Sequence, residues 1–375
     1  MPSGLAEIGG PDLSSVPGAR QPRSMRREIF RMERAEAEAL LGLAEVIHLA
    51  STTAEGEPVL RTVHGVVVRG AIAFHGAPVG EKTEAVGRPA VVSCEQLVAS
   101  IPSYFTDPER ACPATTLYRS AQAHGVIERV DDPDHKAEVL EALMQKYQPE
   151  GGYTPLDASS PLYRKAIAGI LVLAVPLSRL DGKAKLAQNR TPEERARILT
   201  KLWERGAPGD AAAIELLRGA CLDTPVPEFL QAPAGCVLAC ALGPRDVAAA
   251  VDLLEGGYWN QGVSREAIAR ALLGSSAWVG ARDAAGRLVA TARAISDGSR
   301  RAWVYDVMVA PSLRGRGVGE AVVRLLLGHP AVRGASHVHL GTQDAHTFYA
   351  RFGFRDRAAL PPRPFTSTEM VFSRR

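Results

Sequence analysis

Hydrophobic and polar positions in the first half of the chain form short runs separated by turn signals. Apolar or alternating runs predict strands at 46–49, 59–68, 71–75, 90–94, 116–129 and 166–175. Turn sequences such as Glu55-Gly56-Glu57-Pro58 and Arg69-Gly70 separate neighbouring strands. Helical periodicity predicts helices at 33–43, 134–147 and 191–205. Successive short strands with tight turns predict an antiparallel sheet or a small barrel with flanking helices.

The pattern changes after residue 206. Four prolines interrupt the segment 207–234 around one short helical stretch, and such punctuation is typical of a linker. From 235 to 375, strands and helices alternate and end in a strand near 369–372, which predicts a mixed α/β unit of ordinary domain size. Residues 1–24 are rich in Gly, Pro and Ser, so we expect a flexible leader. The sequence therefore predicts an α+β protein with folded domains at 25–206 and 235–375.

Composition narrows the class of protein. Hydrophobic residues make up 46% and charged residues 23% of the 375 residues, as in soluble globular proteins. The formal net charge of +3 is small, so charge does not indicate direct nucleic-acid binding. Five cysteines without CxxC spacing argue against a disulfide framework or a zinc site. Neither a membrane span nor a signal peptide is evident, so we expect a cytoplasmic protein with no membrane partner.

A glycine-rich turn in the second domain carries the strongest local signal. It reads Val309-Ala310-Pro311-Ser312-Leu313-Arg314-Gly315-Arg316-Gly317-Val318-Gly319 and lies between an apolar strand and an amphipathic helix. This layout suits a phosphate, because glycines let the backbone approach an anion and N–H groups at the helix start face it. The order of the glycines fits neither the Walker motif nor the dinucleotide motif. A tight structural turn would share the pattern, so the loop alone does not decide.

The loop resembles the Arg-x-x-Gly-x-Gly signature of GNAT acetyltransferases. The similarity extends to Tyr305-Asp306-Val307-Met308-Val309 before the loop and to Phe348-Tyr349-Ala350-Arg351-Phe352-Gly353-Phe354 after it. It implies that the pyrophosphate of acetyl-CoA lies on the loop backbone, that the pantetheine arm follows a splayed strand, and that a strand N–H polarises the acetyl carbonyl. The cofactor-binding residues implied are Val307, Val309, Arg314, Gly315, Arg316, Gly317, Val318, Gly319 and Asp344.

The same resemblance suggests catalytic residues for acetyl transfer to a small-molecule amine. Tyr349 matches the family tyrosine that often protonates the departing thiolate; the alternative is a tyrosine that only packs. Asp306 is the leading candidate for the general base, with Asp297 and Glu320 as other candidates. As a strand residue, Asp306 is as readily explained by a structural role.

Two further features of the second domain bear on this resemblance. The family often has Asn where this chain has Asp344, which puts the contact of that residue with the cofactor arm in doubt. Tyr258, Trp259 and Asn260 precede a predicted helix. They either line the acceptor pocket or form an aromatic pair in the core.

Basic and hydroxyl side chains cluster at neighbouring predicted strand ends in the first domain. Arg61-Thr62-Val63-His64 lies on one strand, His75 ends the next, and Lys82-Thr83 begins the following segment. Such groups are what a phosphate needs, and flat apolar strand faces suit a ring system. Each signal alone fits a solvated or packed side chain.

Their order resembles the flavin-binding split barrel of the pyridoxamine 5'-phosphate oxidase-like superfamily over about 25–190. By this resemblance, Arg61, Lys82 and Thr83 would hold the phosphate of FMN, and the isoalloxazine would be bordered by Thr62, Val63, His64 and His75. Family barrels complete the flavin site with a second subunit, so we expect a homodimer to which Tyr118 and Arg119 contribute. The stretch 182–190 is similar to an element of flavin-binding negative transcriptional regulators, or is a basic turn before a helix.

These features predict a bifunctional protein, in which an FMN-binding oxidoreductase-like domain is fused to an acetyl-CoA-dependent N-acetyltransferase. The two sites would act on one amine-bearing or nitro-aromatic compound, because nitro reduction yields an arylamine that acetylation masks. The alternative is a sensor or regulatory module that binds flavin without redox turnover and is fused to the acetyltransferase. Reduction of bound FMN by NADH or NADPH separates the two.

Overall fold

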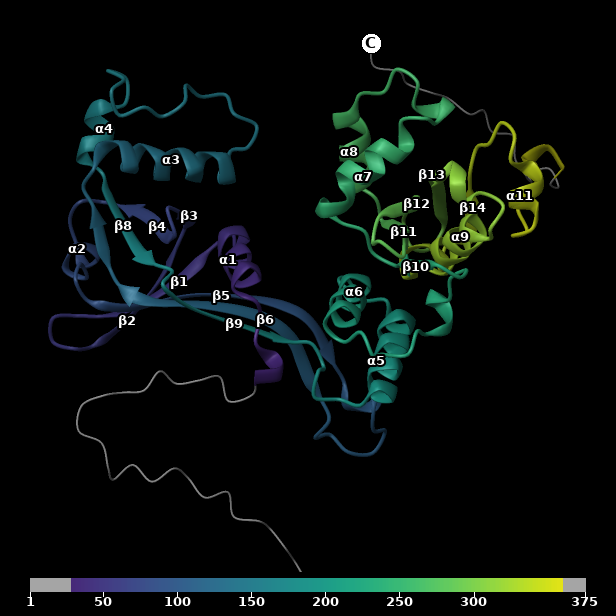
Figure 1. Cartoon of the computed structure of the whole chain (residues 1–375), viewed down its shortest axis with the longest axis horizontal. Helices are drawn as coiled ribbons and strands as arrows, with labels where there is room; N and C mark the ends of the chain where they lie inside the picture. The colour runs from purple at the N-terminus through teal and green to yellow at the C-terminus, as the bar shows by residue number, and fades with distance from the viewer. Residues whose placement is uncertain (1–27, 360–375) are drawn as a thin grey trace, which may run out of the picture. The chain divides into compact units, whose positions relative to one another are not determined.

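The computed structural model describes residues 28–359 of the chain, apart from the side chain of Glu81 (Figure 1). The expected leader at 1–24 and the expected final strand at 369–372 lie outside the described residues. The chain forms two compact units. Unit 1 contains residues up to Gln96 together with Arg119–Lys185, and unit 2 contains Leu97–Tyr118 together with the residues from Leu186 onward.

Unit 1 contains antiparallel strands with flanking helices, as the sequence predicts. Its helices are α1 (Arg34–Leu43), α2 (Glu81–Glu84), α3 (Pro133–Tyr147) and α4 (Arg164–Gly169). One sheet has the strand order β2-β1-β5-β6-β9 and the other the order β3-β4-β8-β7. The strands are β1 (Ile47–Thr52), β2 (Pro58–Val63), β3 (Val66–Val68), β4 (Ala71–Gly76), β5 (Pro89–Ile101), β6 (Thr115–Val126), β7 (Glu128–Val130), β8 (Leu171–Pro176) and β9 (Arg179–Lys185). The end of β5, from Leu97, and the start of β6, up to Tyr118, belong to unit 2.

Several details of this barrel differ from the prediction. The first residues of the strand expected at 166–175 belong to helix α4, and the strand expected at 116–129 is divided into β6 and β7. The expected strand at 59–68 is divided into β2 and β3 around His64-Gly65, where an added Cβ on Gly65 would lie 2.4 Å from Cδ1 of Ile47. The strand expected at 90–94 continues to Ile101, beyond its apolar run. Strand β9 was not predicted, because Arg179–Lys185 is mostly polar and carries no alternating apolar pattern.

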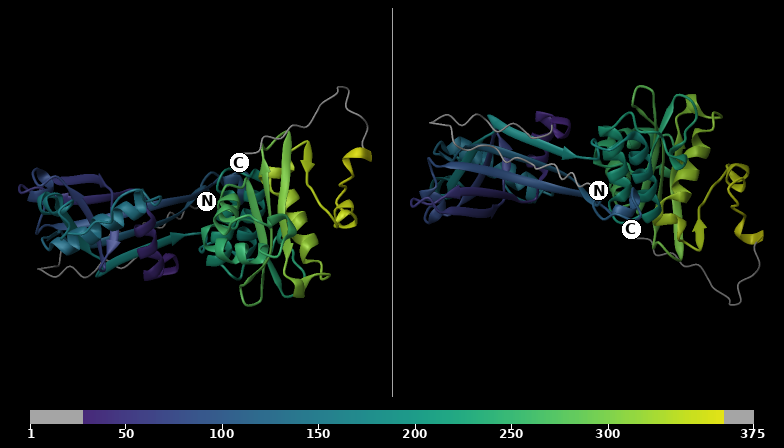
Figure 2. Two further views of the ribbon diagram at one scale, coloured as in Figure 1. Left: turned by 90° about the horizontal axis from the view of Figure 1, so that it is seen from above. Right: turned by 90° about the horizontal axis from the view of Figure 1, so that it is seen from below.

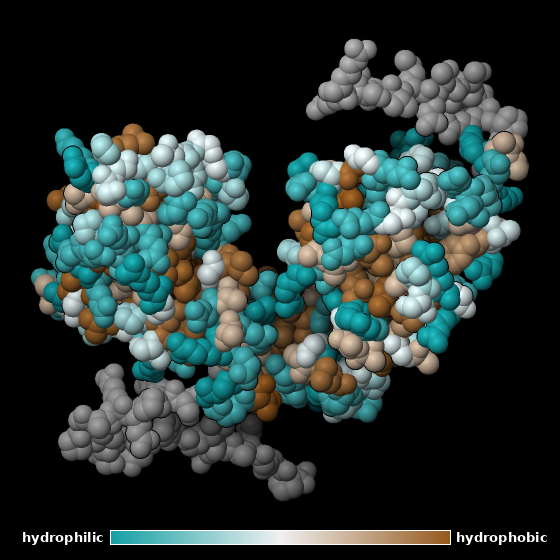
Figure 3. Space-filling view, turned by 45° about the horizontal axis from the view of Figure 1, so that its top comes forward, coloured by the Kyte–Doolittle hydropathy of each residue, from teal (hydrophilic) through white to brown (hydrophobic). Residues whose placement is uncertain are grey.

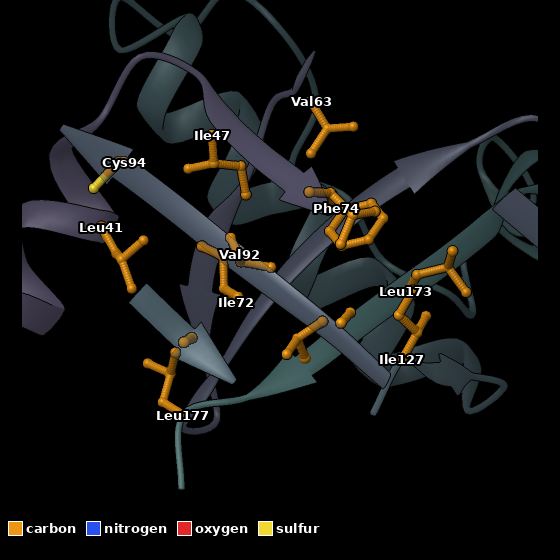
Figure 4. Packing of buried hydrophobic residues seen from close by; sticks show 14 of the residues in the cluster. Leu41, Ile47, Val63, Ile72, Phe74, Val92, Cys94, Ile127, Leu173 and Leu177 are labelled. Atoms are coloured by element: carbon orange, nitrogen blue, oxygen red, sulfur yellow. The ribbon is translucent and has the colours of Figure 1, made fainter. Parts of the chain in front are cut away.

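Apolar side chains from both sheets of unit 1 meet in one core (Figure 4). Ile47 and Val92 come from the first sheet, and Ile72, Phe74 and Leu173 from the second. All five are at most 1% exposed. Burying a side chain of this size stabilises the fold by about 1.5–3 kcal/mol, so the core fixes how the strands that carry the candidate flavin residues pack together.

Unit 2 is built on a mixed five-stranded sheet in the order β10-β11-β12-β13-β14. Its strands are β10 (Cys236–Ala239), β11 (Ala277–Asp283), β12 (Leu288–Ser296), β13 (Arg301–Val309) and β14 (His337–His339). Among the described strands of this sheet, only β13 and β14 pair in parallel. The helices that follow the linker region are α7 (Val247–Leu254), α8 (Arg265–Leu273), α9 (Val318–Gly328), α10 (Pro330–Arg333) and α11 (His346–Ala350). Helices cover both faces of the sheet (Figure 2).

Helices α5 (Pro192–Arg205) and α6 (Asp210–Ala220) belong to the same unit as this sheet. The expected linker at 207–234 therefore contains a helix of 11 residues, and the prolines that suggested a linker lie outside it. Arg218 Nη1 of α6 donates a hydrogen bond of 2.8 Å to Leu238 O of β10, and Cys240 N donates one of 2.8 Å to Glu215 Oε1. The domain limits at 206 and 235 stay a prediction.

The remaining whole-chain expectations concern cysteines, metals and membranes. All five cysteines are free thiols. Among residues 28–359 no group of three or more metal-ligating side chains is present, and none of the helices there combines the length and apolarity needed to cross a bilayer. The face drawn in Figure 3 is mostly polar on both units, with apolar side chains in smaller groups.

Candidate functional site

A cavity of unit 2 lies where β13 and β14 separate. The parallel pairing begins at Arg301 with His337 and ends at Trp303 with His339, whereas β13 continues to Val309. The second half of β13 therefore has no partner from β14, and the β14–α11 segment diverges from it (Figure 2). A cavity of about 1020 Å³ occupies this region.

The cavity brings together most of the residues predicted for the acetyl-CoA site. Nine of them line it: Asp306, Val307, Val309, Arg314, Gly315, Gly317, Gly319, Asp344 and Tyr349. Arg316 does not line it, and Val318 is 1% exposed with its side chain in the core. Only the backbone of Val318 is therefore available to a ligand.

The glycine-rich loop places the start of α9 at this cavity. Gly315 and Gly317 have φ values of 72° and 82°, in the left-handed region that glycine adopts without strain. The first N–H groups of a helix have no acceptor within the helix, so those of Val318, Gly319 and Glu320 remain available. An anion at this point is favoured by these donors and by the helix dipole.

A β-bulge shapes the strand at the cavity. The pairing between β12 and β13 shifts in register between Thr291 and Arg293, and Asp306 opposite this shift has a φ of 52°. The carboxylate of Asp306 is buried, and both of its oxygens accept hydrogen bonds. Oδ2 accepts from Arg293 Nε at 2.5 Å, and Oδ1 accepts from Trp259 Nε1 at 2.9 Å. Asp306 therefore cross-links the bulge, and its role as general base stays a prediction.

Tyr349 stands on α11 at the same cavity. Burial, together with the nearby Tyr258 and Asp344, raises the pKa of Tyr349 to about 12. Its ring packs edge-on against Phe348 with 5.0 Å between ring centroids. A phenol in this environment holds its proton at every physiological pH, as a general acid requires.

In unit 1, Arg61 and Lys82 line one small cavity together with Ala77 and Val79. Its volume is about 260 Å³. The Lys82 side chain lies against Gly76, where an added Cβ would be 3.3 Å from Lys82 Cδ. Two cations therefore share a cavity, which is the charge pattern that binds a phosphate.

Other residues predicted for the flavin site lie around this cavity without lining it. Burial, followed by Coulombic interactions with Lys82 and His64, lowers the pKa of His75. Thr83 Oγ1 donates a hydrogen bond of 3.2 Å to Pro78 O. Of the remaining predicted residues, Thr62 is exposed, whereas Val63 is 7% exposed and its side chain belongs to the core. Only the backbone of Val63 is therefore available to a ligand, whereas the side chain of Thr62 is accessible.

The residues predicted to complete the flavin site of a second subunit do not line this cavity. Tyr118 and Arg119 lie on β6 and do not line the cavity of Arg61 and Lys82. In the similar stretch at 182–190, Leu186 N donates to Gln188 Oε1 at 2.7 Å and Arg190 Nη2 donates to Pro113 O at 2.9 Å. This stretch is thus the end of β9 and a bonded turn before α5.

Two protein families match separate parts of the chain. The pyridoxamine 5'-phosphate oxidase family matches residues 33–184, and the acetyltransferase (GNAT) family matches residues 255–354. The chain joins an oxidase-like domain to a GNAT domain. Both resemblances seen in the sequence are confirmed.

Individual proteins are similar to parts of the chain. Residues of the chain are 41% identical over 75 positions to serotonin N-acetyltransferase 2, chloroplastic, of Oryza sativa subsp. japonica; the match covers 20% of this chain and spans 38% of the length of that relative. A FAD and heme binding protein from Mycobacterium smegmatis is 25% identical, covering 41% of this chain and 71% of that one with a TM-score of 0.35. A GNAT family acetyltransferase from Streptococcus pneumoniae is 22% identical, covering 36% and 98%, with a TM-score of 0.28.

Several residues that line the GNAT cavity were not predicted. They are Trp303 and Tyr305 of β13, Phe348 of α11, and Arg351. The alternation of large aromatic residues in Arg301–Val309 was the available signal, because residues two apart on a strand share a face. Tyr258 and Trp259 line the cavity as well, which favours the pocket alternative over the core alternative.

Proposed function

We propose that the GNAT domain is an N-acetyltransferase that takes acetyl-CoA as donor and a small-molecule amine as acceptor. The observation that carries the proposal is the cavity between β13 and β14, in which the start of α9, the bulged strand and Tyr349 come together. The helix start suits a pyrophosphate, and the edge of β13 beyond its pairing with β14 offers backbone groups to an amide-containing arm.

The chemistry follows from these groups. The amine nitrogen attacks the thioester carbonyl, and a strand N–H near Val309 would stabilise the negative charge that develops on the carbonyl oxygen. Tyr349 then donates its proton to the departing sulfur. Its raised pKa keeps that proton in place until the sulfur becomes a strong base.

We further propose that the oxidase-like domain binds FMN. Arg61 and Lys82 would hold the phosphate, with the hydroxyl of Thr83 nearby, and His64 and His75 would border the ring system. The two cations in one cavity support this assignment. A bound flavin would supply electron transfer, which makes the protein bifunctional if the flavin turns over and a flavin-dependent sensor if it does not.

Acetyl-CoA binding to the full-length chain tests the acetyltransferase. We expect Gly319→Val to abolish most of the affinity measured by calorimetry, because a Cβ there would lie 3.4 Å from Val309 Cγ2 at the cavity wall. The φ of Gly319 is not left-handed, so the substitution should leave the fold intact, whereas Gly317→Val would also strain the backbone.

Gly328→Val is the matched control. Gly328 ends the same helix, where an added Cβ would meet Trp203 at an ordinary 3.8 Å, away from the cavity. The control should bind acetyl-CoA as the unchanged protein does. If the unchanged protein fails to bind acetyl-CoA, or if Gly319→Val binds it equally well, the loop is only a turn and the proposed function is wrong.

A further inference from the structure

The GNAT cavity has an aromatic wall on one face of its sheet. In the registers of β12 with β13 and of β13 with β14, Trp303 lies opposite Ile295 and His339, and Tyr305 lies opposite Arg293. Directly opposed residues share a face of the sheet, so these five side chains project together. Trp303 and Tyr305 also line the cavity and are 40% and 39% exposed.

The rings on this wall are nearly parallel. Trp303 and His339 have centroids 4.9 Å apart and planes inclined by 19°, and Trp303 and Tyr305 have centroids 6.3 Å apart and planes inclined by 22°. The guanidinium of Arg293 lies 4.8 Å from the centroid of the Tyr305 ring, and Asp306 holds that guanidinium by a buried ion pair. The wall is therefore a preformed surface for another flat ring.

The charges around the cavity do not suit a strongly basic amine. Among the described lining residues the carboxylates are Asp306, Glu320 and Asp344. Both oxygens of Asp306 are occupied, and Glu320 pairs with Arg324 at 2.7 Å and with Arg351 at 3.8 Å. Asp344 is the remaining carboxylate, and its charge contributes to the raised pKa of Tyr349. The five residues of the aromatic wall include the cation Arg293 and no carboxylate, so an ammonium group stacked on the wall would find no ion-pair partner among them.

We propose that the acceptor is an arylamine, an amine bonded directly to a planar aromatic ring, which stacks on Trp303 and Tyr305. This inference rests on the proposed acetyltransferase function. An aryl ring withdraws the nitrogen lone pair, so an arylamine is already neutral at pH 7 and needs no general base before attack. A site whose leading base candidate is bonded on both oxygens suits such an acceptor.

The transfer balances without a further reactant. The arylamine nitrogen forms a bond to the acetyl carbon, and the bond between that carbon and sulfur breaks with its electron pair leaving on sulfur. Tyr349 protonates the sulfur and regains a proton from solvent, to which the nitrogen loses one. The products are an N-aryl acetamide and the free thiol.

Three amines of similar size test the acceptor class on the full-length protein. Aniline has a planar ring and a weakly basic amine. Benzylamine has a planar ring and a basic amine, and cyclohexylamine has a non-planar ring and a basic amine. Release of free thiol from acetyl-CoA gives the rate. We expect kcat/KM for aniline to exceed both others by about 10-fold or more, since ring stacking and avoided deprotonation both favour it.

Substitutions in the wall give a second, independent readout. Trp303→Ala and Tyr305→Ala should each raise the KM for aniline by about 10-fold while changing kcat little, because they remove ring contacts made equally before and during reaction. Trp303→Phe should restore most of the loss. Ile295→Ala is the control, because Ile295 is exposed opposite Trp303 on the same face but does not line the cavity.

The outcomes separate this inference from the proposed function. If benzylamine or cyclohexylamine is the better acceptor, or if Trp303→Ala leaves the KM for aniline unchanged, the arylamine assignment is wrong. The same holds if acetyl-CoA binds and none of the three amines is acetylated. If acetyl-CoA does not bind, the proposed function itself has failed, and the assignment falls with it.

Discussion

At the scale of single residues, the cavity of the GNAT domain contains two candidate catalytic groups. Asp306 and Tyr349 both line the cavity, but their surroundings differ. The two carboxylate oxygens of Asp306 accept hydrogen bonds from Arg293 and Trp259. Tyr349 sits in a buried environment that raises its pKa to about 12. Of these two residues, Tyr349 therefore has a proton to donate at the cavity, whereas both carboxylate oxygens of Asp306 already accept hydrogen bonds.

Tyr349→Phe tests that role. The substitution keeps the ring and removes the hydroxyl, so kcat should fall by about 10- to 1000-fold while the affinity for acetyl-CoA stays unchanged. Steady-state kinetics with calorimetry checks both parts. Unchanged kcat in the variant would show that Tyr349 only packs against Phe348.

The pH profile gives a companion readout. The pKa of Tyr349 is raised, so its protonated form is retained up to about pH 12 and the acid is not lost on the basic side of the working range. We expect kcat of the unchanged protein to show no basic limb up to about pH 10, near the pKa of an unperturbed tyrosine. A fall in kcat near pH 8 or 9 would assign the acid to a different group.

At the scale of helices and strands, sequence reasoning succeeded where local signals are strong. Apolar alternation located β4 and β8, and the glycine-rich turn located the start of α9. Sequence reasoning failed where a strand forms because of its pairing with a distant part of the chain. Strand β9 is polar, and its pairing with β6 depends on a distant part of the chain. Similarly, no local pattern predicts that β14 ends after three residues. The early end of β14 leaves room for the cavity.

The start of α5, which helical periodicity predicted near residue 191, provides a test at this scale. Thr191 and Glu194 form a reciprocal capping box, in which Glu194 N donates to Thr191 Oγ1 at 3.3 Å and Thr191 N donates to Glu194 Oε2 at 3.0 Å. Thr191→Ala should lower the free energy of unfolding of unit 2 by about 1 kcal/mol. All four tryptophans of the chain lie in unit 2, so their fluorescence during urea unfolding reports that unit.

Thr200→Ala is the matched control, since it makes the same chemical change in the interior of the same helix. Thr200 Oγ1 only donates to Ala196 O of the preceding turn, and Ala is the better helix former. The control should be neutral or slightly stabilising. Equal effects of the two substitutions would mean that the capping box contributes nothing measurable.

At the scale of the whole molecule, the two proposed sites have related chemistry. Reduction of a nitroarene by a flavin yields an arylamine, which is the acceptor class inferred for the GNAT domain. A redox-active flavin would therefore place the oxidase-like domain one step before the acetyltransferase. Bleaching of the flavin absorbance by NADH or NADPH would support this order, whereas a flavin that binds and resists reduction would favour the regulatory alternative.

Flavin retention also tests how many chains make one site. The proposed phosphate group contacts Arg61 and Lys82, while Tyr118 and Arg119 lie on β6 away from that cavity, so we predict that they complete the site of a second subunit in a homodimer. Lys82→Ala and Arg119→Ala should each lose most of the bound FMN, measured as the visible absorbance of the purified protein. Lys165→Ala, an exposed lysine on α4, should stay yellow.

Mixing the two defective variants decides between one chain and two. In a dimer of one Lys82→Ala chain and one Arg119→Ala chain, one site carries both defects and the other carries neither. Random exchange of subunits would therefore restore about a quarter of all sites. If each site lies within a single chain, every site keeps one defect and the mixture stays colourless. Light scattering that shows a monomer with flavin fully bound would contradict the dimer in the same way.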